Sequence, residues 1–388
     1  MKNKNFFLMI FSVLSLTVIH SLTFHSAVLN AQLSPIFDKN KIGYIDSTGK
    51  IIIPCEYDTE LNFEAFTVGG KMIIDFRIPN MARFQNGAVT VKIPRRFFFS
   101  HSFTYAMLDA KGKYIFEPTE NIIYGLSEGI AIYKRLFKTM QKVYDFNFTY
   151  IDLNQNFITE DVFSYTGVFS DGIALVINDD GYKYINREGK KAFDIDMSRI
   201  GNADIELAES FSEGLAAIRI DSLFGYIDTT GKWVILPTFK SAFPFNNGLA
   251  RVFDGRYYAY INKKGEEITP YEFTFANNFS DGLGLVKSGD KFGYIDTTGR
   301  VVIPFEYVYA QSFSEGLAVV YHNGNFVFID KQGNTVINRR LDYARGFQFG
   351  LAKVWRNDEM FYINKKGETV HQIISRNRYR NAKSSFRN

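Results

Sequence analysis

The chain has 388 residues, 46% of them hydrophobic and 22% charged, which is typical of a folded protein and excludes an intrinsically disordered one. The net charge of +4 comes from two lysines near the start and five basic residues in the tail from His371, so the body between them is acidic. A nucleic-acid-binding surface needs a basic body, and nucleic acid is therefore excluded as a partner. Cys55 is the single cysteine, so no intramolecular disulfide is possible.

The two ends of the chain differ from its body. Residues 1–31 have the features of a secretory signal peptide: two lysines, an apolar run from Phe6 to Ile19, and a cleavage site after Ala31. The run is shorter than the roughly 20 apolar residues of a membrane span, and an uncleaved anchor is the alternative. We expect an exported protein (periplasmic, on the outer surface or secreted) without a transmembrane segment after signal removal. Residues 371–388 form a basic tail that we expect to be flexible.

Between these ends, a tandem repeat runs from residue 37 to residue 370. Its first motif, which we call the tyrosine motif, is Tyr-Ile-Asp/Asn followed by a turn. The Asp or Asn of the nine copies is Asp46, Asp109, Asp152, Asn186, Asp228, Asn262, Asp296, Asp330 and Asn364. From Asp228 onward the copies are 34 residues apart. This fixed period indicates one continuous array rather than two or three separate domains.

A second motif, which we call the glycine motif, keeps step with the first. It reads Phe-Ser-Glu/Asp-Gly-Leu-Ala, as in Phe211–Ala216, and in six units its Gly follows the Asp or Asn by 20 residues. The units within 209–370 are regular and those within 37–208 are irregular. Insertions occur around Phe66 to Pro79 and around Met197 to Ala208.

The sequence of one unit predicts about three strands and no helix. Phe292–Ile295 and Val301–Ile303 are rich in β-formers and predict a hairpin, and Leu317–Tyr321 predicts a third strand. In the turn from Asp296 to Gly299, Asp or Asn bonds its own backbone and Gly supplies a positive φ. This structural turn role is assigned to Asp46, Asp228, Asn262, Asp296, Asp330, Asn364, Gly231, Gly265, Gly299 and Gly333. Because Asn replaces Asp in three copies, the turn explains the Asp or Asn at this position of the tyrosine motif better than a calcium or catalytic site does.

The predicted fold is therefore all-β, with tandem repeats of about 34 residues and about eight units. Both faces of the strand that carries the tyrosine motif are apolar, as expected when neighbouring repeats supply each other's core. We expect an elongated solenoid of β-hairpins. A closed β-propeller is the alternative, since eight units could form a ring.

The repeat resembles the WG repeat family. The resemblance rests on Gly225–Lys232 (Gly-Tyr-Ile-Asp-Thr-Thr-Gly-Lys) and on the glycine motif, and it covers Ile42 to Val370. The family's Trp is replaced throughout, and its Gly is kept only at Gly43, Gly225 and Gly293. The resemblance implies a non-catalytic interaction module, often exported, with no general ligand established.

The residues of the mature chain do not predict a catalytic or metal site. Its three histidines (His101, His322 and His371) are far apart, and only one cysteine is present, so a zinc site is not expected. No nucleophile elbow or phosphate-binding loop occurs. We expect no catalytic residue, no metal and no cofactor.

Four aromatic residues outside the repeated columns are candidates for ligand binding: Trp233, Trp355, Tyr257 and Tyr258. Exposed rings would stack on sugars or enclose a cation, whereas burial in the strands is the alternative. The function expected is that of an exported, non-catalytic binding or scaffold module whose partner is a protein or a cell-envelope glycan. The alternative is a glycan-active enzyme on a β-repeat scaffold, for which the two insertions are where a carboxylate pair would lie.

Overall fold

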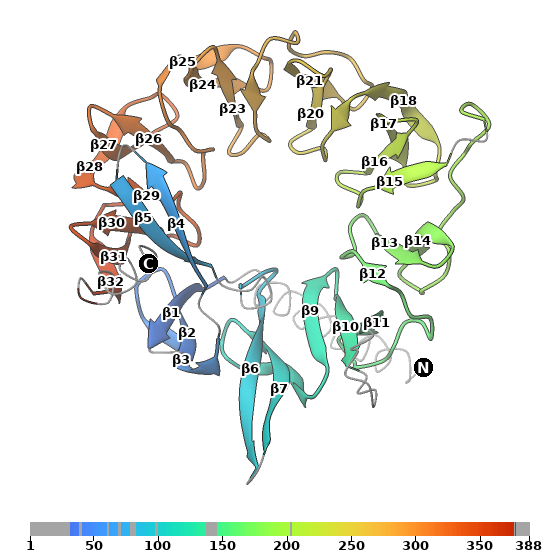
Figure 1. The fold of residues 1–388 in the computed structure, drawn as a ribbon, viewed down its shortest axis with the longest axis horizontal. Coiled ribbons are helices and arrows are strands. Elements are labelled where there is room, and N and C mark those ends of the chain that lie inside the picture. The colour runs from blue at the N-terminus through green and yellow to red at the C-terminus, as the bar shows by residue number, and fades with distance from the viewer. Residues whose placement is uncertain are drawn as a thin grey trace, which may run out of the picture.

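The computed structural model describes residues 32–38, 41–59, 62–68, 71–77, 83–97, 100–136, 146–201, 204–375 and 377. The predicted signal peptide and most of the basic tail lie outside these residues. Figure 1 shows the chain as a closed ring of small antiparallel sheets around a wide central opening. In the part of the chain that is described, no helix is long and apolar enough to span a bilayer.

The ring has nine units, one for each turn residue of the tyrosine motif, rather than about eight. Units 1 to 4 contain β1 (Ser34–Asp38), β2 (Lys41–Ile45) and β3 (Ile51–Asp58); β6 (Ala88–Phe97), β7 (Ser100–Asp109) and β8 (Tyr114–Thr119); β9 (Ile122–Ser127), β10 (Ile130–Leu136) and β11 (Phe146–Asp152); and β12 (Tyr165–Thr166), β13 (Ile173–Asn178) and β14 (Gly181–Asn186). Units 5 to 7 contain β15 (Ile205–Ala208), β16 (Leu215–Ile220), β17 (Leu223–Asp228) and β18 (Trp233–Phe239); β19 (Ser241–Ala242), β20 (Leu249–Phe253) and β21 (Tyr258–Asn262); and β22 (Phe275–Ala276), β23 (Leu283–Ser288), β24 (Lys291–Asp296) and β25 (Val301–Tyr307). Units 8 and 9 contain β26 (Ala318–His322), β27 (Asn325–Ile329) and β28 (Thr335–Leu341); and β29 (Tyr343–Ala344), β30 (Ala352–Arg356), β31 (Glu359–Ile363) and β32 (Thr369–Ile374).

Within a unit the strands are ordered from the central opening outward. A short inner segment, such as β15, is followed by the glycine motif, the second strand (β16), the third strand with the tyrosine motif (β17) and an outer strand (β18). Unit 1 is different. β1 pairs with β2 in the register of a second strand, because Pro35 lies opposite Tyr44 as Ala217 lies opposite Tyr226. Unit 1 therefore has no inner segment among the described residues.

The insertions and boundaries are also resolved. The Phe66 to Pro79 insertion contributes to a separate hairpin of β4 (Asn62–Val68) and β5 (Lys71–Arg77), and the Met197 to Ala208 insertion ends in β15. The array is slightly longer than predicted, because β1 begins at Ser34 and β32 continues to the buried Ile374.

The apolar core lies between units rather than within them. Tyr226 and Ile227 are both fully buried, on opposite faces of β17. Tyr226 packs in a cluster with Phe245 and Ile261 of unit 6, whereas Ile227 packs with Leu175 of unit 4. Each unit thus covers one face of the unit before it and one face of the unit after it.

The two sequence motifs meet in the gaps between units. The Tyr226 ring lies edge-on to Phe245, with ring centroids 4.9 Å apart, and its hydroxyl donates to the Phe243 carbonyl at 2.7 Å. Burial raises the pKa of this hydroxyl well above its ordinary value. The same pairing occurs at Tyr150–Phe169, Tyr184–Phe211, Tyr260–Phe279 and Tyr294–Phe313, where the centroids are 4.8 to 5.1 Å apart.

The same hydroxyl position closes the ring. Tyr362, in the last third strand, donates to the Pro35 carbonyl of β1 at 3.1 Å. One apolar cluster joins Ile36 of unit 1 with Ile363 and Ile374 of unit 9. The structure therefore has the closed ring, and the elongated solenoid is corrected. An open array would leave one apolar face exposed at each end, whereas in the ring these two faces cover each other.

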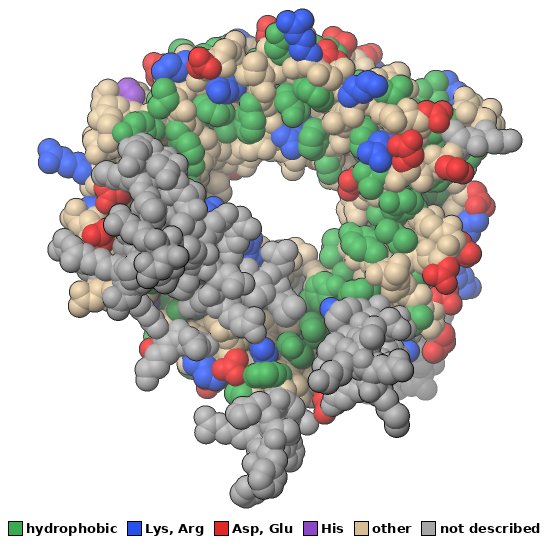
Figure 2. All heavy atoms as spheres, viewed as in Figure 1, with side chains coloured by type: hydrophobic (Ala, Val, Ile, Leu, Met, Phe, Trp, Pro, Cys, Tyr) green, Lys and Arg blue, Asp and Glu red, His purple; other side chains and the backbone are tan. Residues whose placement is uncertain are grey.

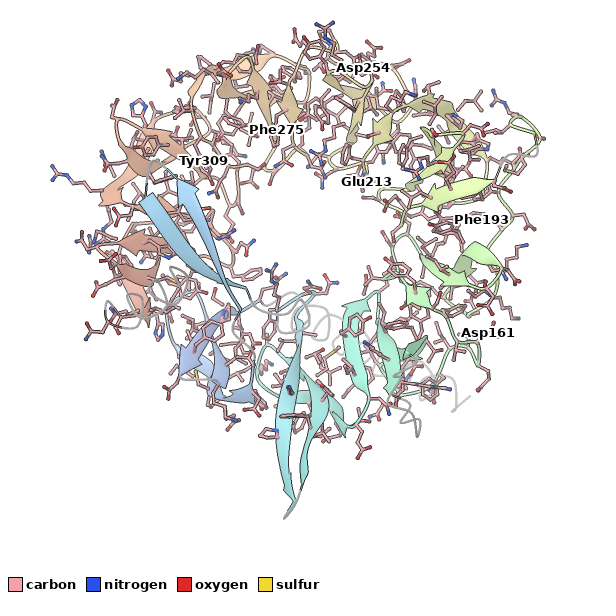
Figure 3. The ribbon with its side chains drawn as sticks, in the orientation of Figure 1. Asp161, Phe193, Glu213, Asp254, Phe275 and Tyr309 are labelled. Atoms are coloured by element: carbon pink, nitrogen blue, oxygen red, sulfur yellow. The ribbon has the colours of Figure 1, made fainter. Side chains whose placement is uncertain are left out.

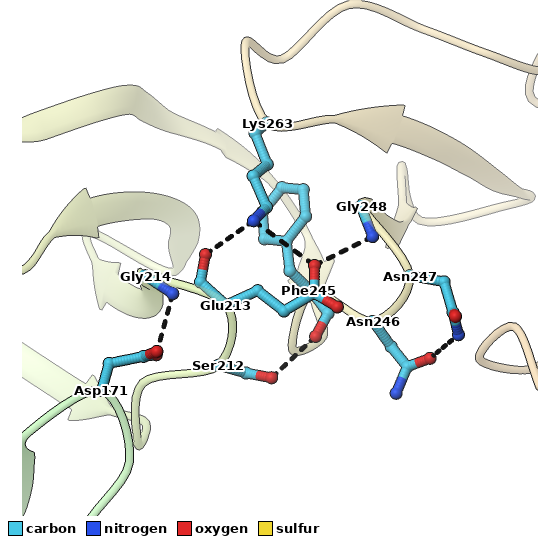
Figure 4. A network of polar contacts seen from close by, with 9 residues as sticks. All are labelled: Asp171, Ser212, Glu213, Gly214, Phe245, Asn246, Asn247, Gly248 and Lys263. Carbon is cyan, nitrogen blue, oxygen red and sulfur yellow. Dashed lines mark hydrogen bonds and ion pairs between the residues drawn. The ribbon is translucent and has the colours of Figure 1, made fainter.

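A second series of contacts links the glycine motifs around the ring (Figure 4). The Glu213 carboxylate accepts the Gly248 N–H of the next unit at 2.9 Å, and Lys263 lies 3.4 Å from it. Equivalent bonds join Glu128 to Gly172, Asp171 to Gly214, Asp281 to Gly316 and Glu315 to Gly350. Asn86 and Asn247, at the same position, instead donate to a carbonyl of the next unit. In unit 9 the position is Phe349, which ends the series.

We expect Glu213→Ala to lower the free energy of unfolding at pH 7 by roughly 1 kcal/mol, because the Gly248 N–H and Lys263 lose their acceptor. Burial raises the pKa of Glu213, but the Gly248 and Asn247 N–H groups and Lys263 outweigh it and hold the pKa below 4.5. The stabilisation is therefore complete above about pH 4.5 and is lost as the pH falls through the lower folded-state pKa. Urea unfolding from pH 3 to 7 measures this difference. Asn247→Ala is the control, and an equal pH dependence in both variants would contradict the assignment.

Tyr226→Phe and Tyr362→Phe each remove one hydroxyl that bonds to the next unit. We expect each variant to lower the free energy of unfolding by roughly 0.5–1.5 kcal/mol, since the acceptor carbonyl loses its donor while the ring packing is kept. Urea denaturation checks this. If Tyr362→Phe unfolds at the wild-type urea concentration while Tyr226→Phe does not, the hydroxyl bond does not contribute to ring closure.

Candidate functional site

The Asp and Asn column of the tyrosine motif is engaged in turns. Oδ1 of Asp228 accepts the N–H groups of Thr230 at 2.8 Å and Lys232 at 3.1 Å, and Asn262 accepts the two corresponding N–H groups. Burial raises the pKa of Asp228, but the bonds from Thr230 and Lys232 outweigh it and lower the pKa overall. Asp46, Asp296, Asp330 and Asn364 accept in the same way. Gly231, Gly265, Gly299 and Gly333 have φ between 83° and 86°.

Both tryptophans are buried, which corrects the expectation that they stack on a ligand. Trp355 is 1% exposed and lies against Tyr343, with ring centroids 5.2 Å apart. Trp233 is 7% exposed and belongs to the apolar cluster between units 4 and 5. Each ring is covered by other side chains of the apolar core, so neither face is open to a sugar.

The two tyrosine candidates are half-buried and lie apart from the tryptophans. Tyr257 donates its backbone N–H to Asp254, which lies at the outer edge of the ring (Figure 3). Tyr258 packs against Phe253, with ring centroids 4.7 Å apart. The four predicted ligand-binding residues come from units 5, 6 and 9 and are not brought together into one site.

A cavity of about 740 Å³ lies on the inner side of the ring at units 7, 8, 9, 1 and 2. Figure 2 shows the central opening and the hydrophobic side chains that gather along its described rim. The residues that line the cavity are Leu33, Ser34, Pro35, Arg83, Phe84, Gln85, Phe275, Asn277, Ser280, Leu285, Ala310, Gln311, Ser312, Phe313, Ser314, Arg345, Gly346, Phe347, Gln348, Phe349, Leu351, Lys353 and Tyr362.

The cavity lies where an inner segment of unit 1 would stand, and the described residues contain no such segment. At other gaps an inner segment fills the space between one third strand and the next second strand, as Phe243 does beside Tyr226. At the last gap, the Tyr362 hydroxyl reaches β1 directly. Sequence reasoning did not find this site. The available signal was the absence of a glycine motif before Ile36, in contrast to every later unit.

The cavity lining can form hydrogen bonds and stack on flat groups. It combines phenylalanines, amides and hydroxyls with the cations Arg83, Arg345 and Lys353, and its described lining has no Asp, Glu, His or Cys. Gln311 is held by its neighbours, since it donates to the Ala344 carbonyl and accepts the Gly346 N–H. Gln348 is exposed. Elsewhere in the described residues, no group of three or more His, Cys, Asp or Glu side chains could hold a metal ion.

Because Trp355 is buried, we expect Trp355→Ala to lower the free energy of unfolding by roughly 3–5 kcal/mol. Tyr257→Ala, at a half-buried ring in an outer turn, is expected to lower the free energy of unfolding by clearly less than Trp355→Ala does. Urea unfolding followed by circular dichroism compares the two variants. A Trp355→Ala variant as stable as the wild type would show that the ring does not pack in the core.

One comparison with a solved structure agrees with this architecture. A crystal structure of a eukaryotic initiation factor aligns with a TM-score of 0.53 at 10% identity, over 88% of this chain and 96% of that one, which shows a shared β-propeller-like fold and no more. AztD from Citrobacter koseri aligns with a TM-score of 0.36 at 13% identity, over 70% of this chain and 91% of that one. The extracellular domain of the putative hybrid two component system BT4673 from B. thetaiotaomicron aligns with a TM-score of 0.31 at 10% identity, over 88% of this chain and 64% of that one.

No curated protein matches the sequence significantly. The model of the WG containing repeat matches residues 42–64, 148–182, 224–257, 258–292, 292–326 and 328–358. These matches extend from the first unit to the ninth, and the chain belongs to the WG repeat family.

Proposed function

We propose that the protein is an exported, non-catalytic ring that binds a protein or a cell-envelope glycan in the cavity on its inner side. The cavity itself is the observation that carries this proposal. It offers aromatic faces, amides and cations, which are groups that recognise a polar polymer. Export rests on the signal-like features of residues 1–31.

The competing function, a glycan-active enzyme, has less support. Hydrolysis of a glycosidic bond ordinarily uses two carboxyl groups about 5–10 Å apart, and the described cavity lining contains none. In the Met197 to Ala208 insertion, Glu206 forms an ion pair with Arg219 at 2.8 Å. Glu206 is not among the residues that line the cavity.

Gly346 allows the cavity to be filled with little disturbance of the fold. It lines the cavity, a Cβ placed on it meets no atom closer than 3.8 Å, and its φ lies outside the left-handed region. Other units carry a side chain at this position, as at Val168 of unit 4, which is 40% exposed. Val168→Tyr is therefore the matched control for Gly346→Tyr.

The test uses the protein expressed from its full sequence and purified from the exported fraction. Co-sedimentation with purified cell-envelope glycans and binding to isolated envelope proteins are measured for the wild type, Gly346→Tyr and Val168→Tyr. We expect saturable binding that Gly346→Tyr weakens at least tenfold and Val168→Tyr leaves unchanged. Retention in the cytoplasm, equal binding by both variants, or release of reducing ends from a glycan would contradict the proposal.

A further inference from the structure

In units 4 to 9, the inner segment is bonded to the second strand at one constant position. The acceptor is the carbonyl of the second-strand residue that lies opposite the tyrosine of the tyrosine motif, as Arg251 lies opposite Tyr260. The bonds are Gly167 N–H to Leu175, Glu209 to Ala217, Phe243 to Arg251, Asn277 to Leu285, Gln311 to Val319 and Arg345 to Lys353, at 2.8 to 3.2 Å. The inner segment therefore lies along the inner edge of the second strand in each of these units. We call this position the lane.

In unit 1 the corresponding residue is Pro35, opposite Tyr44. In the part of the chain that the structure describes, β1 is the terminal strand of its sheet. Pro35 is compatible with a further strand at this edge. In the units above, the group of the equivalent residue that bonds the inner segment is its carbonyl, and proline keeps this acceptor.

The cavity coincides with this lane. Its walls include Pro35 of unit 1, Tyr362 and Lys353 of unit 9, and Arg83 and Gln85 of unit 2. These are the three units that would surround an inner segment of unit 1. The space that a segment of the chain takes in the regular units is therefore the cavity at unit 1.

We propose that this lane binds an extended segment of a partner protein, which adds to β1 as the inner strand of unit 1. The inference rests on the proposed binding function and names its ligand as a polypeptide. Main-chain bonds to a strand edge supply affinity in this mode of recognition, and pockets for alternate side chains supply specificity. The inner segments of the protein itself show which side chains fit.

In unit 7 the inner segment places Ala276 and Phe279 in the core, where they are 1% and 3% exposed, and Asp281 follows. A partner segment with a small residue, an aromatic residue three positions later and then an acidic residue reproduces this pattern. The acidic residue is favoured by the cations Arg83, Arg345 and Lys353 in the cavity lining. The same cations disfavour the basic tail of this chain as the occupant.

The residues that precede Leu33 are the other possible occupant from this chain. By sequence they align with an inner segment, with Leu29 at the phenylalanine position. The residues at the turn position of the sequence, Asn30-Ala31-Gln32, lack the glycine that stands at Gly87, Gly129, Gly172, Gly214, Gly248, Gly282, Gly316 and Gly350, each with a positive φ. Cleavage after Ala31 would also remove them. A segment supplied by another protein therefore fits better.

The test uses a fluorescein-labelled peptide with the sequence of residues 272–282 (Glu-Phe-Thr-Phe-Ala-Asn-Asn-Phe-Ser-Asp-Gly). Its binding to the protein expressed from the full sequence is measured by fluorescence anisotropy, and mass spectrometry determines the N-terminus of the purified protein. We expect saturable binding that is weakened at least tenfold by Gly346→Tyr in the protein or by Phe279→Ala in the peptide. Val168→Tyr is expected to bind like the wild type.

Hydrogen exchange locates the peptide independently of the variants. We expect the amides of β1 to exchange at least tenfold more slowly when the peptide is bound. Absence of saturable binding, equal loss in both tyrosine variants, or unchanged exchange in β1 would overturn the proposal. If the purified protein retains residues 22–31 and binds no peptide, its own segment fills the lane and the partner proposal is also overturned. Failure to bind envelope components would refute the proposed function without affecting this result.

Discussion

An aromatic pair and a hydroxyl bond cross five consecutive gaps of the ring, from unit 3 to unit 8. The tyrosine of one third strand lies edge-on to the phenylalanine of the next glycine motif and donates to the carbonyl two residues before it, as Tyr226 does with Phe245 and Phe243. Because the partners belong to different units, no unit can bury its tyrosine alone. Met107 and Phe328 take the tyrosine position in two units and cannot donate, so those gaps lack the hydroxyl bond and are crossed by apolar packing and by the contacts of Asn86 and Glu315.

The strands, the turns and the period could be predicted because they depend on residues that act within one unit. Asp228 and Gly231 specify a turn by their own chemistry, whatever surrounds them. Ring closure could not be predicted, since no pattern inside a unit states how far each unit is rotated from the one before. Trp355 shows the same limit: its ring is a plausible stacking surface until Tyr343 is known to cover it.

The contacts of the acidic position in the glycine motif explain why the residue type at this position varies between units. Glu213 needs a glycine N–H in the next unit, and Asn247 keeps contact with the next unit by donating to the Phe279 carbonyl instead. Phe349 has no following glycine motif within the described residues and therefore no partner that would favour an acid. The change from Glu to Phe thus marks the place where the repeat series ends and the candidate site begins.

The bonds between successive glycine motifs also give the ring a direction. Each runs from one unit to the next along the chain, beginning at Asn86 and ending at Glu315, so among the described residues the gap between unit 9 and unit 1 has no such bond. It is held by the Tyr362 hydroxyl and by apolar contacts. The closure of the ring therefore depends on one non-covalent interface, whereas every other gap is also crossed by the chain itself.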